Sequence, residues 1–203
     1  MHQRKYNAAD LVVIGAGPGG YAAAFLAADL GMDVTLIDPN PNPGGVCLYE
    51  GCIPSKSLLN AARLIHEAGH ADEMGISFSK PEIDIDKLRA WKNGVVDKLT
   101  NGLGRLVYQR KITYIRGNAA FIGDSILRID TEEVGSQKLA VEHAIIATGS
   151  IPVGIPGLDT NGRIILDSSS ALDLKDIPQQ LLIVGGGYIG LEMGTVYALS
   201  LIH

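Results

Sequence analysis

The stretch Leu11-Val12-Val13-Ile14-Gly15-Ala16-Gly17-Pro18-Gly19-Gly20 decides the fold of this chain. Its four apolar residues have the pattern of a buried parallel strand, and the glycines after them match G-x-G-x-x-G. An Ala-rich stretch over residues 21–30 predicts a helix that Gly31 ends, and residues 33–38 predict a second strand. Together these segments form a βαβ unit, which predicts a Rossmann-like α/β domain.

The glycine motif predicts a dinucleotide site. Gly15 allows the tight turn, Gly17 lets the backbone approach a pyrophosphate, and Gly20 permits close packing of helix and strand, while the helix N-terminus attracts phosphate charge. Asp38 ends the second strand, close to the expected position about 20 residues further on, where a carboxylate can accept hydrogen bonds from ribose hydroxyls. The alternative is a glycine turn in an α/β protein without nucleotide, and the full context favours the nucleotide.

In the middle of the chain, the spacing of apolar residues changes twice. Residues 39–53 are rich in Pro, Asn and Gly and predict a loop. Pro54 can open a helix, and apolar residues at helical spacing predict a longer core-packing helix after Pro81. A period of two follows, which predicts a small antiparallel β-meander and a further strand over residues 112–116, 119–122, 126–129 and 141–148.

The pattern of a strand followed by glycines occurs a second time, over residues 181–190. We therefore expect residues 1–150 to form most of one domain and residues 160–203 to form the beginning of a second Rossmann-like domain. The intervening residues 151–159, rich in Pro and Gly, are predicted to link them. The second domain has no room for its second strand before His203.

Composition excludes several classes of protein. The 203 residues are 46% hydrophobic, enough for a substantial core, but no apolar run has the length needed to span a membrane. The net charge is −5 with no basic cluster, so nucleic acid is not an expected partner. Residues 1–10 lack the apolar core of a signal peptide, which predicts a cytoplasmic protein. Two cysteines are too few for a secreted disulfide scaffold.

Cys47 and Cys52 admit three interpretations. They could be buried small hydrophobes, or they could bind zinc, because with His66 and His70 they spell C-x4-C-x13-H-x3-H. The surrounding residues have no finger-like hairpin pattern, and Gly69 is predicted to end the helix before His70. We therefore expect no metal site and interpret both histidines as solvated surface.

The third interpretation is a redox pair. Four residues separate the cysteines, which is enough to close a small disulfide loop. If Pro54 starts a helix, Cys52 lies just before its N-terminus, where the helix dipole favours a thiolate. Lys56 then lies on the first turn, as a cation near the same site or as an ordinary exposed lysine.

Residues 45–56, Gly-Val-Cys-Leu-Tyr-Glu-Gly-Cys-Ile-Pro-Ser-Lys, closely resemble the FAD-dependent pyridine nucleotide-disulfide oxidoreductases. Further matches follow in the expected order: the first glycine motif with Asp38, then Ala147-Thr148-Gly149-Ser150, then residues 185–194. The resemblance covers residues 10–197. The Ile-Pro-Ser-Lys tail favours the branch of dihydrolipoyl dehydrogenases over glutathione enzymes, and a mercuric- or glutathione-reductase-like flavoenzyme is the alternative.

The resemblance implies two cofactors, FAD and NAD. The residues that would bind FAD are Gly15, Gly17, Pro18, Gly19, Gly20, Asp38, Gly44, Gly45, Val46, Cys47, Lys56, Ala119, Thr148, Gly149 and Ser150. Those that would receive NAD are Gly185, Gly187, Tyr188, Ile189, Gly190 and Glu192. Cys47 would be the interchange thiol and Cys52 the thiolate in charge-transfer contact with the flavin. Lys56 would pair with Glu192 near the flavin and the nicotinamide.

The implied reaction is the oxidation of dihydrolipoamide, carried on the acyltransferase component of a 2-oxo acid dehydrogenase complex, with reduction of NAD. Members of the family are homodimers more than twice this long. The resemblance thus predicts an FAD-binding domain of three-layer ββα character without its C-terminal segment, followed by a truncated NAD domain. None of the five histidines lies in a matching base motif, so little or no turnover is expected, and a non-catalytic FAD-binding fragment is a further alternative. Residues 200–203 fit the family pattern poorly.

Overall fold

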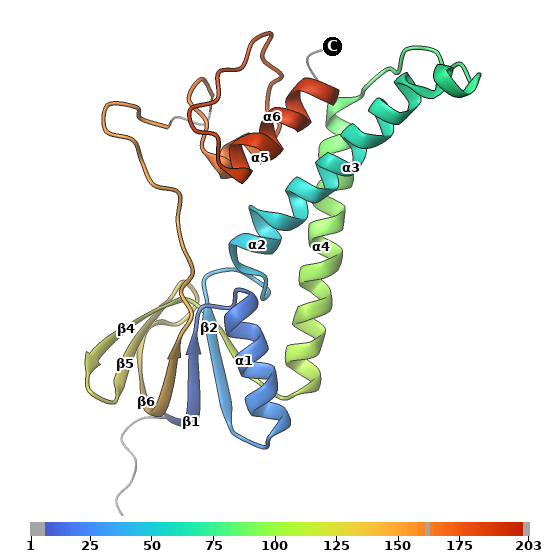
Figure 1. Cartoon of the computed structure of the whole chain (residues 1–203). Helices are drawn as coiled ribbons and strands as arrows, with labels where there is room; N and C mark the ends of the chain where they lie inside the picture. The colour runs from blue at the N-terminus through green and yellow to red at the C-terminus, as the bar shows by residue number, and fades with distance from the viewer. Residues whose placement is uncertain (1–6, 161–162, 201–203) are drawn as a thin grey trace, which may run out of the picture. The chain divides into compact units, whose positions relative to one another are not determined.

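The computed structural model describes residues 7–160 and 163–200, which belong to two compact units (Figure 1). The first, the sheet unit, consists of Met1–Leu48 and Lys98–Ser150. The second, the helical unit, consists of Tyr49–Asp97 and Ile151–His203. The domain boundaries expected from the sequence, with a linker over residues 151–159, stay a prediction.

The sheet unit is built on a six-stranded sheet with the strand order β3-β2-β1-β6-β5-β4. Its strands are β1 (Asn7–Ile14), β2 (Val34–Asp38), β3 (Thr113–Arg116), β4 (Asn118–Gly123), β5 (Ile126–Thr131) and β6 (Gly135–Ile146). β1 pairs in parallel with β2 on one side and β6 on the other, so that Val12 lies opposite both Thr35 and Ala144. β3 continues the parallel part, whereas β4, β5 and β6 pair antiparallel. The Rossmann-like α/β fold with its β-meander is confirmed.

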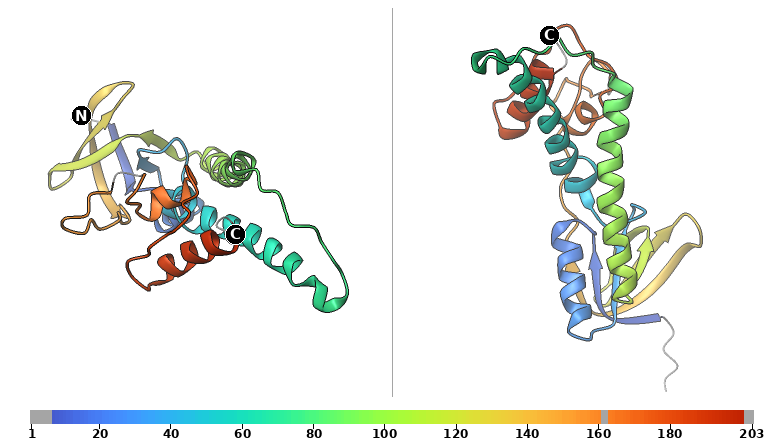
Figure 2. Two further views of the ribbon diagram at one scale, coloured as in Figure 1. Left: turned by 90° about the horizontal axis from the view of Figure 1, so that it is seen from above. Right: turned by 90° about the vertical axis from the view of Figure 1, so that its right-hand side faces the viewer.

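Apolar residues cover both faces of this sheet, as expected for strands of a parallel sheet. On one face, Leu11 and Val13 of β1 pack with Ala24 of α1 (Pro18–Asp29) and with the C-terminal end of α4 (Ile85–Gln109). On the other face, Val12 packs with Leu127 of β5. The small side chains of α1 let that helix lie directly along β1 and β2 (Figure 2).

The helical unit contains α3 (Cys52–Gly69), the 3-10 helix η1 (Ala71–Met74), the first part of α4, α5 (Ser168–Leu172) and α6 (Tyr188–Ser200). Its core joins Leu58 of α3 to Leu172 of α5 and to Val196 and Tyr197 of α6. Among the described residues, no helix has both the length and the apolar character needed to cross a membrane.

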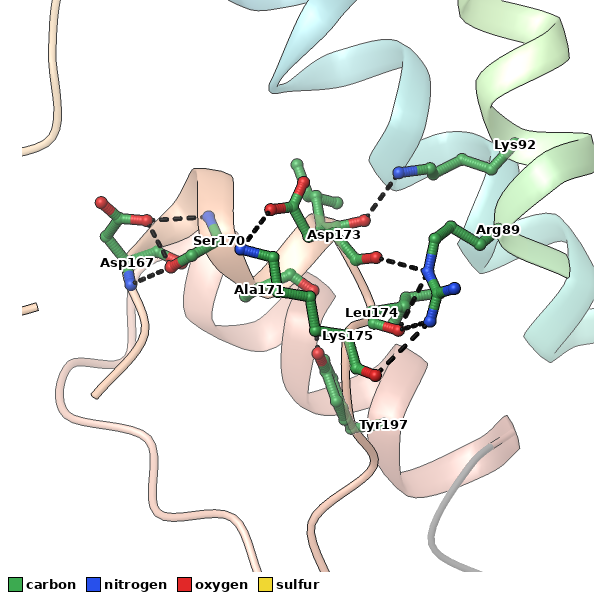
Figure 3. A network of polar contacts seen from close by, with 10 residues as sticks. Arg89, Lys92, Asp167, Ser170, Ala171, Asp173, Leu174, Lys175 and Tyr197 are labelled. Carbon is green, nitrogen blue, oxygen red and sulfur yellow. Dashed lines mark hydrogen bonds and ion pairs between the residues drawn. The ribbon is translucent and has the colours of Figure 1, made fainter. Parts of the chain in front are cut away.

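Two cations of α4 bind backbone carbonyl groups at the C-terminal end of α5 and just after it (Figure 3). Arg89 donates to the carbonyls of Asp173 and Leu174, and Nζ of Lys92 donates to the carbonyl of Leu172 at 2.8 Å. The last carbonyls of a helix have no partner within that helix, so a cation there both satisfies them and complements the helix dipole. The hydroxyl of Tyr197 donates to the carbonyl of Ala171 at 2.8 Å and closes the network.

The loop predicted over residues 39–53 is wrong in its second half. α2 (Gly45–Tyr49) forms there, and α3 begins at Cys52 rather than at Pro54. The amide of Leu48 donates to the carbonyl of Gly44, and that of Ser55 donates to the carbonyl of Gly51. Burial of Leu48 gives the short helix an apolar anchor that the Pro-, Asn- and Gly-rich composition hides.

The strand predicted at the start of residues 181–190 is also wrong. Residues 181–186 have no regular secondary structure, although α6 begins after the glycines as expected. A strand needs a neighbour to complete its ladder of hydrogen bonds, and the described part of the helical unit contains no strand beside this segment. Of the poorly fitting end, Ser200 closes α6, while residues 201–203 lie outside the described residues.

Lys92 predicts a pH dependence of the helical unit. Burial lowers the pKa of Lys92 from its ordinary value of 10.5, the nearby Arg89 lowers it further, and Asp173 acts in the opposite direction. Because the unfolded chain then binds this proton more tightly than the folded chain, the free energy of unfolding rises with pH between the lowered pKa and 10.5. Burial also raises the pKa of Tyr197, which opposes this trend above about pH 10.

We expect the stability of the helical unit to increase as the pH rises toward 10, and the increase to be lost in Lys92→Met. Urea unfolding followed by the fluorescence of Trp91, the single tryptophan, measures this. Lys87→Met is the matched control, because its side chain on the same helix is 85% exposed. If the free energy of unfolding rose equally with pH in the wild type and in Lys92→Met, the assignment of this pH dependence to Lys92 would be contradicted.

Candidate functional site

The first glycine turn of the sheet unit has no room for side chains. Gly15 has φ +95°, and a Cβ atom there would overlap the carbonyl oxygen of Ala147, which follows β6. A Cβ atom at Gly20 would overlap the carbonyl oxygen of Gly15. The amide of Ala147 in turn donates to the carbonyl of Ile14 at 2.8 Å. The N-terminus of α1 is therefore held directly against the ends of β1 and β6.

The segment that leads to the first cysteine packs on this turn. Gly45 has φ +57°, and a Cβ atom there would lie 2.5 Å from the Cα of Gly17. The amide of Gly44 donates to the carbonyl of Ala16 at 2.8 Å. Two segments of the sequence prediction, the glycine motif and the start of the cysteine motif, thus lie in backbone contact. Val46 and Cys47 follow in α2, with Val46 45% exposed and Cys47 half-buried.

The N-terminus of α1 can receive an anion. Gly17 occupies its N-cap position and has no side chain to cap the first amides, Pro18 lies at the first helical position, and the first turn carries no acidic residue. Gly19 is exposed, and a Cβ atom there would meet nothing within 4 Å. Unsatisfied amides and the positive end of the helix dipole are the two features that bind phosphate groups.

Asp38 lies beside the same turn and is 6% exposed. Its Oδ2 accepts the amide of Ala16 at 2.7 Å, and its Oδ1 accepts both the amide and the side chain of Asn40 at 2.9 and 3.0 Å. The sequence prediction did not include Asn40, and no pattern in the sequence marks it as a partner. The carboxylate is thus fixed at the end of β2, and its contact with a ribose stays a prediction.

The remaining predicted FAD residues lie on two elements of the sheet unit. Thr148, Gly149 and Ser150 follow β6 at the edge where β1 and β2 also end, and Gly149 has φ +74°. Ligands of open α/β sheets bind at the carboxyl ends of the strands, which is this edge. Ala119 lies in β4, opposite Ile129 of β5, and packs against the core.

Cys52 opens α3 in the helical unit and is exposed. Gly51 is the N-cap residue, so Cys52 lies at the N-terminal, positive end of this 18-residue helix. One turn further, Nζ of Lys56 contacts Oε1 of Glu192 on α6 at 3.0 Å. The roles predicted for this ion pair, beside a flavin and a nicotinamide, stay predictions.

The second glycine turn repeats the geometry of the first. Gly185 has φ +107°, and a Cβ atom at Gly190 would lie 2.6 Å from the carbonyl oxygen of Gly185. The turn and α6 line an open cavity of about 600 Å³, formed by Ile183, Gly185, Gly186, Gly190, Leu191, Gly194, Thr195 and Ala198. The predicted NAD residues Tyr188 and Ile189 open α6 with exposed side chains, and Gly187 precedes them.

The zinc interpretation of the sequence requires a cluster of metal-binding side chains. Among the residues that the structure describes, no group of three or more His, Cys, Asp or Glu side chains that could hold a metal ion is found.

Comparison with known proteins shows that the chain belongs to the pyridine nucleotide-disulphide oxidoreductase family. A family described as "Pyridine nucleotide-disulphide oxidoreductase" matches residues 9–200. Dihydrolipoyl dehydrogenase of Halobacterium salinarum is 46% identical over 191 residues, and that of Vibrio cholerae is 48% identical over 189 residues; both alignments cover 93% of this chain and 40% of the relative. The chain thus spans about two fifths of the length of these relatives.

Among solved structures, the HOCl-induced flavoprotein disulfide reductase RclA from Escherichia coli matches with a TM-score of 0.77 and 32% sequence identity. That match covers 93% of this chain and 39% of RclA. The likeness of fold therefore extends over nearly all of this chain.

The contact between Gly17 and Gly45 allows the stability of the sheet unit to be tested by substitution. Gly45→Ala places a methyl group against backbone that cannot move aside, at a positive φ, and we expect the free energy of unfolding of the sheet unit to fall by about 2 kcal/mol or more. Hydrogen exchange of the β1 and α1 amides measures the loss. Gly19→Ala is the control: its site is open and helical, so protection is expected to stay equal or rise. Unchanged protection in Gly45→Ala would show that the close contact between Gly45 and Gly17 does not constrain the fold of the sheet unit.

Proposed function

Because the chain belongs to the pyridine nucleotide-disulphide oxidoreductase family, we propose that it is the flavin- and disulfide-bearing portion of a dihydrolipoyl dehydrogenase. The observation that carries the proposal is the packing of Gly44 and Gly45, which start the cysteine segment, on the glycine turn at Ala16 and Gly17. This contact brings the start of a redox cysteine motif to a nucleotide-binding edge. The names of the curated relatives, at 46% and 48% identity, support the choice of substrate.

The residues of the sheet unit fit FAD. Gly17 and Gly45 leave a surface of bare backbone, the N-terminus of α1 offers unsatisfied amides, and Asp38 presents a fixed carboxylate. We propose that these residues bind the ADP half of FAD and that Val46, Cys47, Lys56 and residues 148–150 bind the rest. When bound, FAD would supply the capacity to take an electron pair from the reduced cysteine pair and pass it to a nicotinamide as hydride, chemistry that amino acid side chains lack.

The cysteines would perform the thiol–disulfide exchange. A thiolate of dihydrolipoamide attacks the Sγ of Cys47 in a Cys47–Cys52 disulfide, which forms a mixed disulfide and releases Cys52 as a thiolate. The second substrate thiolate then attacks the substrate sulfur of the mixed disulfide, which gives lipoamide and releases Cys47 as a thiolate. The substrate is oxidised by two electrons and the protein disulfide is reduced by two. The released Cys52 lies at the N-terminus of α3 in this scheme.

The second glycine turn would receive the nicotinamide dinucleotide, with Gly185, Gly187 and Gly190 under the pyrophosphate and Glu192 held by Lys56. We propose NAD rather than NADP, an acyltransferase-bound dihydrolipoamide as the partner, a homodimeric parent protein and a cytoplasmic location. A mercuric- or glutathione-reductase-like enzyme is the second candidate, because such enzymes share the cysteine motif.

An anaerobic absorbance titration of the chain reconstituted with FAD tests the flavin–disulfide site. We expect bound flavin and, on addition of a two-electron reductant, a new long-wavelength charge-transfer band. Cys52→Ser should bind flavin without the band. Cys47→Ser has no disulfide to reduce, so it should show the band before any reductant is added, because Cys52 is the partner thiolate, and should lose it when the reductant reduces the flavin. Flavin that bleaches in the wild type with no such band would refute the assignment of Cys52.

We further propose that this 203-residue chain completes little or no dihydrolipoamide turnover by itself. Thiolate formation at neutral pH needs a base, and none of the five histidines lies in a motif that matches the family's base. Steady-state reduction of NAD by dihydrolipoamide measures this. A rate near that of full-length relatives would overturn the expectation.

A further inference from the structure

Two histidines outside the proposed redox site lie side by side at the C-terminal end of α3. His66 is in the last turn of the helix and His70 is its C-cap residue, four positions further on. Their ring centroids are 4.1 Å apart, and both residues are exposed. Residues four apart on a helix share a face, so the spacing brings the two imidazoles to one point of the surface. Imidazole nitrogen is a preferred ligand of zinc, copper and nickel ions.

The ring of His70 is already oriented. Its Nδ1 lies 2.9 Å from the carbonyl oxygen of His66, and because a carbonyl oxygen only accepts, Nδ1 carries the proton. The lone pair of the neutral ring is then on Nε2. Histidines that bind metals usually donate their second ring nitrogen to a backbone carbonyl or carboxylate, which fixes both tautomer and orientation. The same carbonyl accepts the amide of His70 at 3.2 Å, so the end of α3 itself holds the ring.

The sequence next to the two histidines is acidic, and the described residues leave coordination positions open. Asp72 and Glu73 follow in η1, both exposed, and Glu67 lies between the histidines in the sequence. Arg63 pairs with Glu67 at 2.6 Å, which places that carboxylate in a separate contact. In the described ranges no third His, Cys, Asp or Glu completes a cluster, so a bound ion would keep water at its other positions.

We propose that His66 and His70 form a two-histidine site for a divalent transition-metal ion, with nickel, copper and zinc as the ions it accepts. This site uses neither cysteine and is independent of the proposed redox function. Because the ion bridges the last turn of α3 to its cap, it binds the formed helix end and not the frayed one. Occupancy therefore stabilises the end of the helix by mass action.

Calorimetric titration of the full chain with Ni²⁺ tests the site, since nickel does not oxidise thiols. His66→Gln and His70→Gln should each weaken binding by about tenfold or more. The matched control changes the other three histidines together, His2→Gln, His143→Gln and His203→Gln, and should keep the wild-type affinity. Mg²⁺, which prefers oxygen ligands, should not bind there.

A second readout locates the ion. Hydrogen exchange of the amides of residues 66–70 should slow on addition of Ni²⁺ in the wild type and not in His66→Gln. Equal nickel affinity in the wild type and both single variants would overturn the proposal. So would a loss of binding in Cys47→Ser/Cys52→Ser with none in the histidine variants, because the thiols would then be the ligands.

Discussion

The sheet unit depends on one steric constraint, the meeting of bare backbone at Gly15, Gly20 and Ala147. No side chain fits at Gly15 or Gly20, because each site is closed by a carbonyl oxygen of the neighbouring segment. The parallel pairing of β1 with β6 brings these segments together, and α1 must start where β1 stops. The consequence is an uncapped helix N-terminus at the edge of the sheet, with the Asp38 carboxylate bonded to the amide of Ala16 beside it. Packing alone therefore produces these features at the edge where ligands of open α/β sheets bind.

The second glycine turn shows which part of this arrangement is local. Gly190 packs against Gly185 in the same way that Gly20 packs against Gly15, and each pair is five residues apart. Each turn leads into a helix, α1 or α6. The strand before the second turn does not form, and Leu182 and Val184 there are 87% and 69% exposed. Turn and helix are therefore encoded within a few residues, whereas the strand requires a partner from elsewhere in the chain.

The same distinction explains what could be predicted from the sequence. The βαβ unit, the meander and the glycine turns could be predicted from the spacing of apolar residues and from the Gly and Pro residues between segments. Both are local signals. The cysteine motif predicted the family, and its comparison with known proteins agrees. α2 was missed because its buried apolar residue, Leu48, lies among turn-forming residues. The role of Asn40 beside Asp38 was missed because it depends on a contact that no sequence pattern marks. The roles of Arg89 and Lys92 could not be predicted either, since their partners are backbone carbonyls eighty or more residues away.

The ion pair of Lys56 and Glu192 illustrates how buried residues place exposed ones. Lys56 is 61% exposed and Glu192 is 25% exposed, so solvent screens the pair and its own contribution to stability is small. Its partners are nevertheless 136 positions apart and meet at 3.0 Å. Leu58, two residues after Lys56, and Met193, next to Glu192, belong to one buried cluster that joins α3 to α6. The core fixes the two helices, and the ion pair is a result of that fit. The ion pair therefore matters less for stability than for holding an ammonium and a carboxylate in fixed positions. A functional site needs charged groups that are fixed in this way.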